Sequence, residues 1–398
     1  MKILVINAGS SSIKFRLYDM PSEKLLCSGL AERIGEEQSF IKCLIAVGDL
    51  EKSVENESPI ADHSEAIRQI LAILMDPSNL VISNTKEIDV VGHRVVHGGE
   101  TFSKATLVTN EVKEKIVQLF PIAPLHNPAN YRCIEVTQHF FPDAKHLAVF
   151  DTAFHQTLPP KAFRYAIPES FYKKDKIRAY GFHGISHKYV TQKAREYLNK
   201  PLAKMISIHL GNGCSITAVE GDTALDTSMG FSPLNGLVMG TRSGDIDPSI
   251  IFHMANKLEL RLEDINTVLN KQSGLTGLCD MNDMRDIRKA INEGNKDAEF
   301  ACEIYAYRIR KYIGAYAAVL NGLDTIIFTA GVGENDTVMR ELVCSNMEFL
   351  GISLDKKRNQ LRVKDVLEIN TEPSKVKILV VPTNEELEIA IQSYEICK

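Results

Sequence analysis

The chain has 398 residues, 44% hydrophobic and 24% charged, as in a globular protein long enough for two or three domains. Its formal net charge of −5, from 46 basic and 51 acidic residues, gives no electrostatic reason to expect nucleic acid as a partner. No apolar run approaches the ~20 residues that cross a bilayer, which predicts no membrane partner, and the apolar start at 3–6 is too short for a signal sequence. Eight cysteines without C-x-x-C spacing predict free thiols and a cytoplasmic location.

Short β-branched runs alternate with amphipathic patterns along the chain. Strands are expected at 3–6, 89–91, 205–209, 325–329 and 376–381. One helix is expected over 61–75 with Asp62 as its cap, and another over 384–396 with Asn384 as its cap. A third, over 298–320 and ending at Gly322, is expected to bury one face, made of Phe300, Ile304, Ile313, Ala317 and Leu320. This alternation predicts α/β domains with covered sheets.

One pattern occurs twice. Residues 3–15, ILVINAGSSSIKF, and residues 206–219, ISIHLGNGCSITAV, both predict a strand, a turn of small residues and a second strand. Two such turns half a chain apart suggest a duplicated domain with a ligand-binding cleft between the copies. A similarity over a dozen residues also arises by chance, so this pattern alone leaves both explanations open.

Several common catalytic motifs are missing from the sequence. There is no Gly-Lys dipeptide, which excludes a Walker A loop, and neither the protein-kinase motifs nor H-E-x-x-H occur. His93 and His97, like His183 and His187, have the i,i+4 spacing of helical metal ligands, but each pair encloses or adjoins glycine. A catalytic zinc site on a continuous helix is therefore not expected.

Three turns rich in small residues could hold phosphate groups. They cover 7–12, 211–213 and 331–335, and Lys14 follows the first. Short side chains leave backbone N–H groups open to phosphate oxygens, and serine hydroxyls add donors. A tight hairpin turn is the alternative for any one of them. Three turns of one chemical type favour a nucleotide site.

Four further residues could carry chemistry, and each also has a structural interpretation. Arg94 lies in an apolar stretch and needs an anionic partner, either a ligand or a structural carboxylate. Asp151 ends an apolar strand, where α/β enzymes present catalytic groups or where an acid caps a turn. His183 lies between glycines, which suits close approach to a ligand, although most single histidines are structural. Arg242 lies among small residues that could admit an oxyanion or form a surface turn. Together they predict an α/β phosphotransferase.

The residues also carry a family resemblance over almost the whole chain. Nine segments occur in the order found in acetate kinases, which belong to the superfamily of sugar kinases, actin and the large heat-shock ATPases. They are VINAGSSSIKF at 5–15, VGHRVVHGGE at 91–100, PLHNP at 124–128, FDTAFHQTLP at 150–159, YGFHGISH at 180–187, IHLGNGCSITAV at 208–219, MGTRSGDIDP at 239–248, AGVGEN at 330–335 and PTNEE at 382–386.

The resemblance implies a fold and a reaction. The fold is two duplicated actin-like (ribonuclease H-like) α/β domains facing a central cleft. The first domain is expected over 1–150 plus 384–398, and the second, with the nucleotide site and a homodimer contact, over 151–383. The reaction is reversible transfer of the γ-phosphoryl group of ATP to acetate, giving acetyl phosphate and ADP, with Mg²⁺ or alternatively Mn²⁺.

The resemblance also implies site residues, by position. The catalytic residues are His183 and Arg242, which stabilise charge on the phosphoryl group, and Asp151, the active-site acid, which positions Mg²⁺ or its water. Those that bind acetate are Arg94 and the apolar Val96, Leu125, Phe182 and Pro233. Those that organise the metal ion are Asn7 and Glu385. Those that bind the nucleotide are Lys14, His209, Leu210, Gly211, Asn212, Gly213, Asp283, Met284, Arg285, Gly331, Val332, Gly333, Glu334 and Asn335.

Two positions depart from the family pattern, and two rival functions stay open. Ile185 stands where threonine is usual, and Asn235 where the family often has glutamate; neither matches a residue with an implied catalytic role. A propionate or butyrate kinase would share the fold and mechanism, because one methylene in an apolar pocket is worth only ~1 to 3 kcal/mol. A non-enzymatic actin-like ATPase scaffold is the other rival, and it would leave the acyl-kinase segments without a role.

Overall fold

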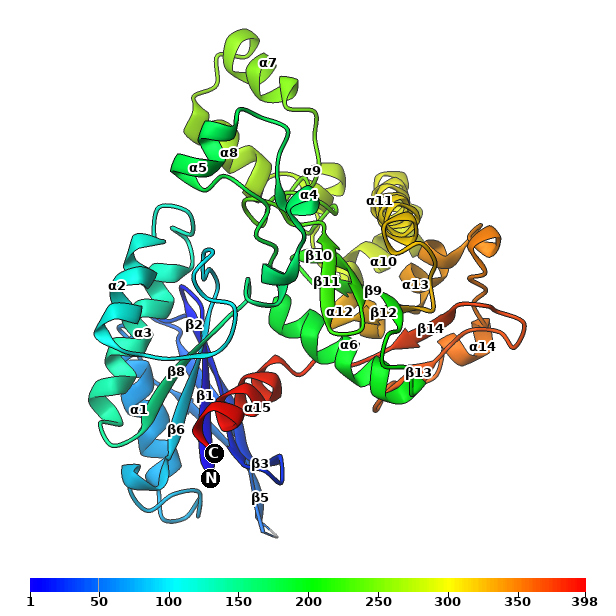
Figure 1. Ribbon diagram of the computed structural model, residues 1–398. Helices are drawn as coiled ribbons and strands as arrows, with labels where there is room; N and C mark the ends of the chain where they lie inside the picture. The colour runs from blue at the N-terminus through cyan, green and yellow to red at the C-terminus, as the bar shows by residue number, and fades with distance from the viewer. Residues whose placement is uncertain (49) are drawn as a thin grey trace. The chain divides into compact units, whose positions relative to one another are not determined.

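A computed structural model describes residues 1–48 and 50–398 and divides the chain into two compact units (Figure 1). Unit 1 comprises Met1–Ala153 and Asn384–Lys398, and unit 2 comprises Phe154–Thr383. The chain therefore leaves unit 1 once and returns to it for its last helix. In the described ranges, no helix has the length and apolar character needed to span a membrane.

Unit 1 is built on an eight-stranded sheet in the order β5-β4-β3-β2-β1-β6-β8-β7. Strands β1, β6 and β8 run parallel, whereas β2 to β5 form an antiparallel meander and β7 is antiparallel to β8. The strands are β1 (Lys2–Ala8), β2 (Ser12–Asp19), β3 (Lys24–Glu32), β4 (Phe40–Val47), β5 (Leu50–Glu57), β6 (Val90–Val95), β7 (Thr106–Leu107) and β8 (Lys145–Phe150).

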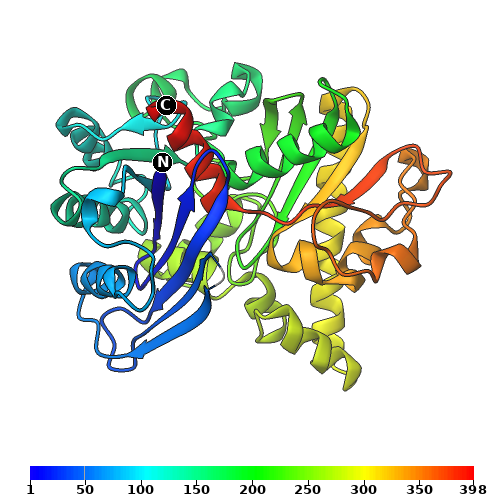
Figure 2. The same ribbon diagram turned by 90° about the horizontal axis from the view of Figure 1, so that it is seen from below.

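Helices cover this sheet and bury its apolar residues. They are α1 (His63–Met75), α2 (Asn110–Gln118), α3 (Asn127–Phe140), α15 (Glu385–Cys397) and the 3₁₀ turn η1 (Thr85–Glu87). The last helix, α15, lies beside β1 in both ribbon views, and both chain termini lie in this unit (Figures 1 and 2). It approaches β6 so closely that a Cβ on Gly92 would lie 2.8 Å from atoms of Ile389 and Ser393. Glycine at 92 therefore allows the terminal helix to pack directly on the sheet.

Unit 2 is built on a six-stranded sheet in the order β11-β10-β9-β12-β14-β13. Its strands are β9 (Lys204–Leu210), β10 (Cys214–Glu220), β11 (Thr223–Thr227), β12 (Thr325–Thr329), β13 (Leu367–Glu368) and β14 (Lys377–Val380). Its helices are α4 (Pro160–Phe163), α5 (Glu169–Asp175), α6 (Gly184–Leu198), α7 (Ser249–Lys257), α8 (Leu262–Lys271), α9 (Gly274–Cys279), α10 (Met284–Asn292), α11 (Lys296–Leu320), α12 (Ala330–Asn335), α13 (Thr337–Cys344) and α14 (Lys356–Asn359), with 3₁₀ turns η2 (Phe154–Thr157) and η3 (Glu348–Leu350).

The two sheets share one topology. The order β3-β2-β1-β6-β8-β7 in unit 1 corresponds strand for strand to β11-β10-β9-β12-β14-β13 in unit 2. The strand directions also agree. In each unit, adjacent strands among the first three in this order are antiparallel, and the next two run parallel to β1 in unit 1 or to β9 in unit 2. The edge strand, β7 or β13, is antiparallel to the strand beside it. Unit 1 adds β4 and β5. The predicted α/β fold with a duplicated domain is therefore confirmed.

The sequence signals for element boundaries are confirmed at several helix ends. The side chain of Asp62 accepts a hydrogen bond from Glu65 N at the start of α1, and that of Asn384 accepts one from Leu387 N at the start of α15. The long helix α11 ends at Leu320, followed by Asn321 in the left-handed conformation and Gly322 at φ +127°.

Two local predictions were wrong. Phe300, expected on the buried face of α11, is 59% exposed, because the helix buries the neighbouring Ala298, Ala301 and Cys302 instead. The segment 331–335, expected as a turn, forms the short helix α12 directly after β12.

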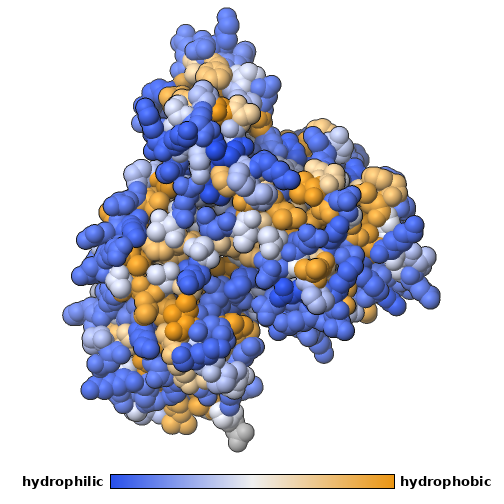
Figure 3. Space-filling model, viewed as in Figure 1, coloured by the Kyte–Doolittle hydropathy of each residue, from blue (hydrophilic) through white to orange (hydrophobic). Residues whose placement is uncertain are grey.

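The surface visible in Figure 3 is mostly hydrophilic, with apolar side chains scattered over it, as is usual for folded proteins.

Candidate active site

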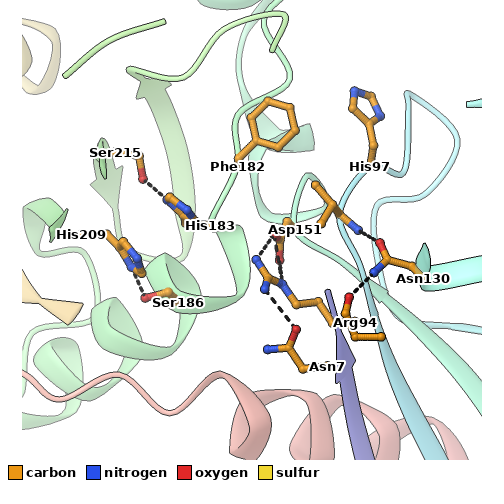
Figure 4. A network of polar contacts seen from close by, with 12 residues as sticks. Asn7, Arg94, His97, Asn130, Asp151, Phe182, His183, Ser186, His209 and Ser215 are labelled. Atoms are coloured by element: carbon orange, nitrogen blue, oxygen red, sulfur yellow. Dashed lines mark hydrogen bonds and ion pairs between the residues drawn. The ribbon is translucent and has the colours of Figure 1, made fainter. Parts of the chain in front are cut away.

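Unit 1 gathers polar residues where its three parallel strands end. Asn7 lies near the end of β1, Arg94 near the end of β6, and Asp151 directly follows β8. Arg94 Nη2 donates to Asp151 Oδ2 at 2.7 Å, and Nε contacts both carboxylate oxygens at 3.1 and 3.2 Å. Its Nη1 donates to Asn7 Oδ1 at 3.1 Å (Figure 4). The carboxyl ends of parallel strands meet at one sheet edge, which brings these residues together.

Carboxylates dominate the electrostatics of this edge. Burial lowers the pKa of the Arg94 guanidinium, but Asp151, Glu385 and Glu386 outweigh burial, and the net pKa is raised. Burial, with the Asp151 and Glu386 charges, raises the pKa of Glu385 against the opposing pull of Arg94. Three acidic side chains thus surround this guanidinium, but Glu386 also pairs with Arg16 at 3.6 Å, and Lys14 lies beside Asn7 in the β1–β2 register. The raised pKa of Glu385 means that a further cation beside its carboxylate would stabilise the ionised form.

Amides of α3 fix the loop after β6, and the sequence did not single them out. Asn130 accepts from Val96 N at 3.1 Å and donates to Ala8 O at 2.7 Å, so it ties the end of β1 to the loop. Asn127 accepts from His97 N and donates to His97 O, both at 3.0 Å. Asn127 belongs to the PLHNP segment, so its motif was visible while its role was not.

In unit 2, two nitrogen-bearing side chains reach the glycine-rich hairpin between β9 and β10. A Cβ placed on Gly213 would lie 3.5 Å from Arg242 Nη1 and 3.5 Å from His183 Nε2. The absence of a side chain at 213 therefore leaves one point to which both nitrogens are close. His183 holds a left-handed backbone conformation (φ +56°) at the start of α6, which is uncommon for a residue other than glycine.

Arg242 differs from Arg94 in having neutral contacts. Its Nη1 donates to Pro233 O at 3.1 Å and lies 3.8 Å from Met239 Sδ. Burial lowers the pKa of its guanidinium, and among the residues in the described ranges no carboxylate forms an ion pair with it. A half-buried guanidinium without an anionic partner is costly, so this position suits an anionic ligand.

A pocket of about 950 Å³ opens beside this hairpin in unit 2. Ligand pockets for cofactor-sized molecules fall in this range. Its floor and walls include residues of α10 and α12, where Asp283 caps α10 and pairs with Arg285 at 2.5 Å. The residues expected to bind a nucleotide that line it are Gly211, Asn212, Asp283, Met284, Arg285, Gly331, Val332 and Asn335.

The other expected nucleotide residues lie elsewhere. His209, Leu210 and Gly213 belong to β9 and its hairpin, and Gly333 lies within α12. Glu334 accepts hydrogen bonds from Ala330 N at 2.8 Å and Thr383 N at 3.0 Å, so its carboxylate holds the end of β14 beside α12. Lys14 belongs to unit 1.

The expected acetate-binding residues divide between the units. In unit 1, Val96 is half-buried beside Arg94, and Leu125 is 64% exposed. In unit 2, Phe182 is buried next to His183, and Pro233 supplies its carbonyl to Arg242.

Several polar residues behind His183 escaped the sequence reasoning. Ser215, His187 and Ser207 form a hydrogen-bonded series behind it, and Ser186 contacts His209 Nδ1 at 2.8 Å. Ser186, His187 and Ser215 lie in the segments 180–187 and 208–219, so their motifs were visible, but only strand register and helix packing reveal their contacts. In unit 1, Glu386 accepts from Asn7 Nδ2 at 3.3 Å.

The two departures from the family pattern lie in unit 2. Ile185 is buried in the first turn of α6. The Asn235 amide donates to Asp245, which also accepts from Gly236 N at 2.8 Å and from Tyr312 OH at 2.7 Å. Neither residue contacts Arg94, His183 or Arg242 in any hydrogen bond described here.

The repeated α/β sheet and the charged groups at the strand ends fit the class of phosphotransferases. Comparison with known proteins narrows the class. The model of the acetokinase family matches residues 2–391, and the chain belongs to that family.

Relatives at high identity cover the whole chain. The chain is 54% identical over 396 residues to the acetate kinase of Flavobacterium johnsoniae, covering 100% of this chain and 99% of that protein. It is 53% identical over 402 residues to the acetate kinase of Thermotoga maritima, covering 100% and 98%.

Solved structures agree. The crystal structure of Porphyromonas gingivalis acetate kinase matches with a TM-score of 0.93 at 43% identity over 100% of both chains. That of a propionate kinase from Francisella tularensis matches with a TM-score of 0.91 at 41% identity over 99% of both chains.

Proposed function

We propose that this chain is an enzyme that transfers the γ-phosphoryl group of ATP to acetate, reversibly, giving acetyl phosphate and ADP. The observation that carries the proposal is its match over the full length, at 54% identity, to a protein named acetate kinase. The charged groups of both units support it, because phosphoryl transfer is catalysed mainly by positioning and charge stabilisation.

Unit 2 would hold the nucleotide. The pocket lined by residues of α10 and α12 would take the adenosine, and the 211–213 hairpin would take the phosphates. Arg242 and His183 would then face the γ-phosphoryl group at the point close to both nitrogens. There they would share the negative charge that spreads over the equatorial oxygens during transfer.

Unit 1 would hold the carboxylate. A guanidinium carries five N–H donors, and the contacts of Arg94 with Asp151 and Asn7 use three of them. The remaining two can donate to the oxygens of acetate. Val96 and Leu125 would contact the methyl group, and Phe182 and Pro233 of unit 2 are the other apolar residues that the family resemblance implies for it.

The carboxylate-rich edge of unit 1 fits a magnesium ion, with manganese as the alternative. Among residues 1–48 and 50–398, no group of three or more His, Cys, Asp or Glu forms a preformed metal site. Mg²⁺ in phosphotransferases is held by one or two carboxylates plus substrate phosphates, which the raised pKa of Glu385 and the nearby Asn7 and Asp151 fit. When bound, the ion neutralises charge on the phosphate oxygens.

The chemistry requires no general base. A carboxylic acid is already ionised near neutral pH, so acetate can attack directly, and Asp151 would position the metal or its water and orient Arg94. Direct in-line transfer inverts configuration at phosphorus. A chiral γ-phosphate of ATP should therefore give inverted acetyl phosphate, and net retention would show a phosphoenzyme instead.

The match to a propionate kinase makes that activity the second candidate. One methylene in an apolar pocket discriminates by only ~1 to 3 kcal/mol. Acetate, propionate and butyrate should be compared as acceptors with ATP, trapping each acyl phosphate with hydroxylamine. The highest kcat/KM with acetate supports the proposal, a higher value with propionate or butyrate assigns the other acid, and no hydroxamate with any acid favours a non-enzymatic scaffold.

We also infer a cytoplasmic homodimer that assembles through unit 2. Phe252 of α7 is 65% exposed and Leu262 of α8 is 72% exposed, which supports a contact with a second copy. Light scattering after size exclusion tests this, and a monomeric mass at micromolar concentration would contradict it.

A further inference from the structure

A series of buried polar side chains leads away from His183 into unit 2. His183 Nδ1 lies 3.0 Å from Ser215 Oγ, which lies 2.7 Å from His187 Nε2. His187 Nδ1 lies 2.8 Å from Ser207 Oγ. Ser215, His187 and Ser207 are fully buried, and Figure 4 shows the His183 ring turned toward Ser215. Ser215, His187 and Ser207 together are called the relay.

The β-sheet register and α6 together assemble the relay. Ser215 of β10 pairs with His209 of β9, and Ser207 lies two residues before His209 on the same face. His187 lies one turn into α6, which packs on β9. Because every member lies on a regular element, the relay is held rigidly behind the site.

The hydrogens of the relay must run in one direction. Ser215 has a single hydroxyl hydrogen, and in the described part of the chain its Oγ has only the imidazole nitrogens of His183 and His187 as hydrogen-bond partners. The buried hydroxyl therefore donates to one of them and accepts from the other. His187 is neutral, because burial, with His155 and His209 nearby, lowers its pKa well below the ordinary value. A neutral imidazole has one donor and one acceptor nitrogen. Hydrogens therefore point either all toward His183 or all toward Ser207.

The direction decides what His183 can offer a ligand. If hydrogens point toward His183, its Nδ1 accepts, and a neutral ring carries its hydrogen on Nε2. If they point away, Nδ1 donates, and only an imidazolium would also have a hydrogen on Nε2. Nε2 is the nitrogen near Arg242 Nη1 at the hairpin, so it needs a hydrogen to bond a phosphoryl oxygen.

The surroundings of His183 favour the neutral ring. The residue stands at the N-terminus of the 15-residue helix α6, the positive end of the helix dipole. Its ring stacks on that of His209 with centroids 4.2 Å apart, and Arg242 approaches the same point at the hairpin. Near this place α6 also carries His187, and β10 carries the thiol of Cys214, which interacts electrostatically with Arg242. A second positive charge here would be opposed by the helix dipole and by Arg242.

We propose that Ser207, His187 and Ser215 are positioning residues that direct hydrogens toward His183 Nδ1, so that a neutral His183 donates its Nε2 hydrogen to the phosphoryl group in transfer. A neutral imidazole at a helix N-terminus can act as an electrophile in this way. The inference rests on the proposed function for the identity of the ligand, but the state of the ring can be measured without it.

The direct test is the nitrogen NMR spectrum of the whole protein labelled with ¹⁵N-histidine. His183 resonances are assigned by their loss in His183→Gln. We expect an unprotonated Nδ1 and a protonated Nε2 at pH 7.5, with no substrate present. A protonated Nδ1, in either a neutral ring or an imidazolium, would overturn the proposal while leaving the proposed function intact.

Kinetics supply the second measurement. Ser215→Ala should lower kcat about tenfold, the effect of losing one hydrogen bond to a key group, and change KM for ATP and acetate little. Ser215→Thr keeps the hydroxyl and should retain most of the activity. A wild-type kcat in Ser215→Ala would overturn the relay. If that variant does not fold, Ser207→Ala, one step further back, replaces it. A wild-type protein that forms no acyl phosphate would refute the proposed function instead.

Discussion

The two units have the same sheet topology and opposite electrostatic character. At the strand ends of unit 1, Arg94 is held by Asp151, and the carboxylates of Glu385 and Glu386 raise its pKa. At the strand ends of unit 2, Arg242 contacts neutral atoms and burial lowers its pKa. One duplicated fold has thus produced an arginine paired with a carboxylate in unit 1 and an arginine with neutral contacts in unit 2.

The largest expected effect comes from the uncompensated arginine. Arg242→Ala should lower kcat about 10³-fold, because the charge on the migrating group loses its cation. Arg242→Lys should recover part of the loss, since it restores charge without the planar fork. Steady-state kinetics with acetate and ATP, together with ATP binding by calorimetry, provide the measurement. A defect confined to ATP binding would mean that Arg242 has been given the wrong role.

The compensated arginine should show a different defect. Arg94→Ala leaves the 2%-exposed carboxylate of Asp151 without its partner. Discounting for the partly exposed guanidinium, unfolding in urea should be easier by about 2 to 3 kcal/mol, with a raised KM for acetate. Adding Asp151→Asn should recover much of the stability and none of the acetate binding. Equal stability of Arg94→Ala and Arg242→Ala would remove the contrast between the units.

Lowering the pH tests a property that both units share, namely histidines that are buried and neutral. Burial lowers the pKa of His97 in unit 1 to about 4, against 6.5 for an ordinary histidine. Between these values the unfolded chain binds the extra proton, so stability is full above pH 6.5 and falls as the pH drops toward 4. His97 alone should cost about 2 kcal/mol between pH 7 and pH 5.

His97→Asn isolates this contribution. The amide oxygen can still accept from Gly99 N, as His97 Nδ1 does at 3.0 Å, but it does not titrate. Urea unfolding at both pH values should therefore show a smaller difference for the variant than for the wild type. An unchanged difference would assign the acid sensitivity to other histidines whose pKa is lowered by burial, such as His93, His146 and His187.

The smallest change is one methyl group. Gly213→Ala places a Cβ at ordinary contact distance from Arg242 and His183, so the fold should tolerate it. The methyl group would take the place where the phosphoryl group is expected, and kcat should fall about tenfold through misplacement. Gly314→Ala, which adds a methyl group to open space on α11, is the matched control. Full activity in Gly213→Ala would place the phosphoryl group elsewhere.

Much of the fold could be predicted because its signals are local. The side chains of Asp62 and Asn384 cap the helices that follow them, which made both helix starts predictable. The repeated strand–turn–strand pattern predicted the duplicated sheet. The face of α11 could not be predicted in the same way. Helical periodicity finds apolar positions, but small residues such as Ala301 let neighbouring elements approach, and this left Phe300 outside.

The site residues also differ in whether their positions could be predicted from the sequence. Arg94 lies near the end of β6 and Asp151 directly follows β8, and these strands are parallel neighbours, so the meeting of the two residues follows from the topology of the sheet. Ser215 and His187 could not be found this way, because their contact depends on the register of β9 with β10 and on where α6 lies. Asn130 likewise works through a hydrogen bond to Ala8, a residue 122 positions away. Long-range pairing of small polar groups leaves no trace in local sequence.

The path of the chain has a consequence for how the protein is made. Unit 2 is one continuous stretch, whereas the sheet of unit 1 needs α15, whose Ile389 and Ser393 lie against Gly92. During synthesis the first strands leave the ribosome long before the segment that covers them. Unit 2 can fold as soon as residue 383 has emerged, while unit 1 must wait with an apolar face uncovered. Chaperone binding to nascent chains should therefore concentrate on the first 153 residues.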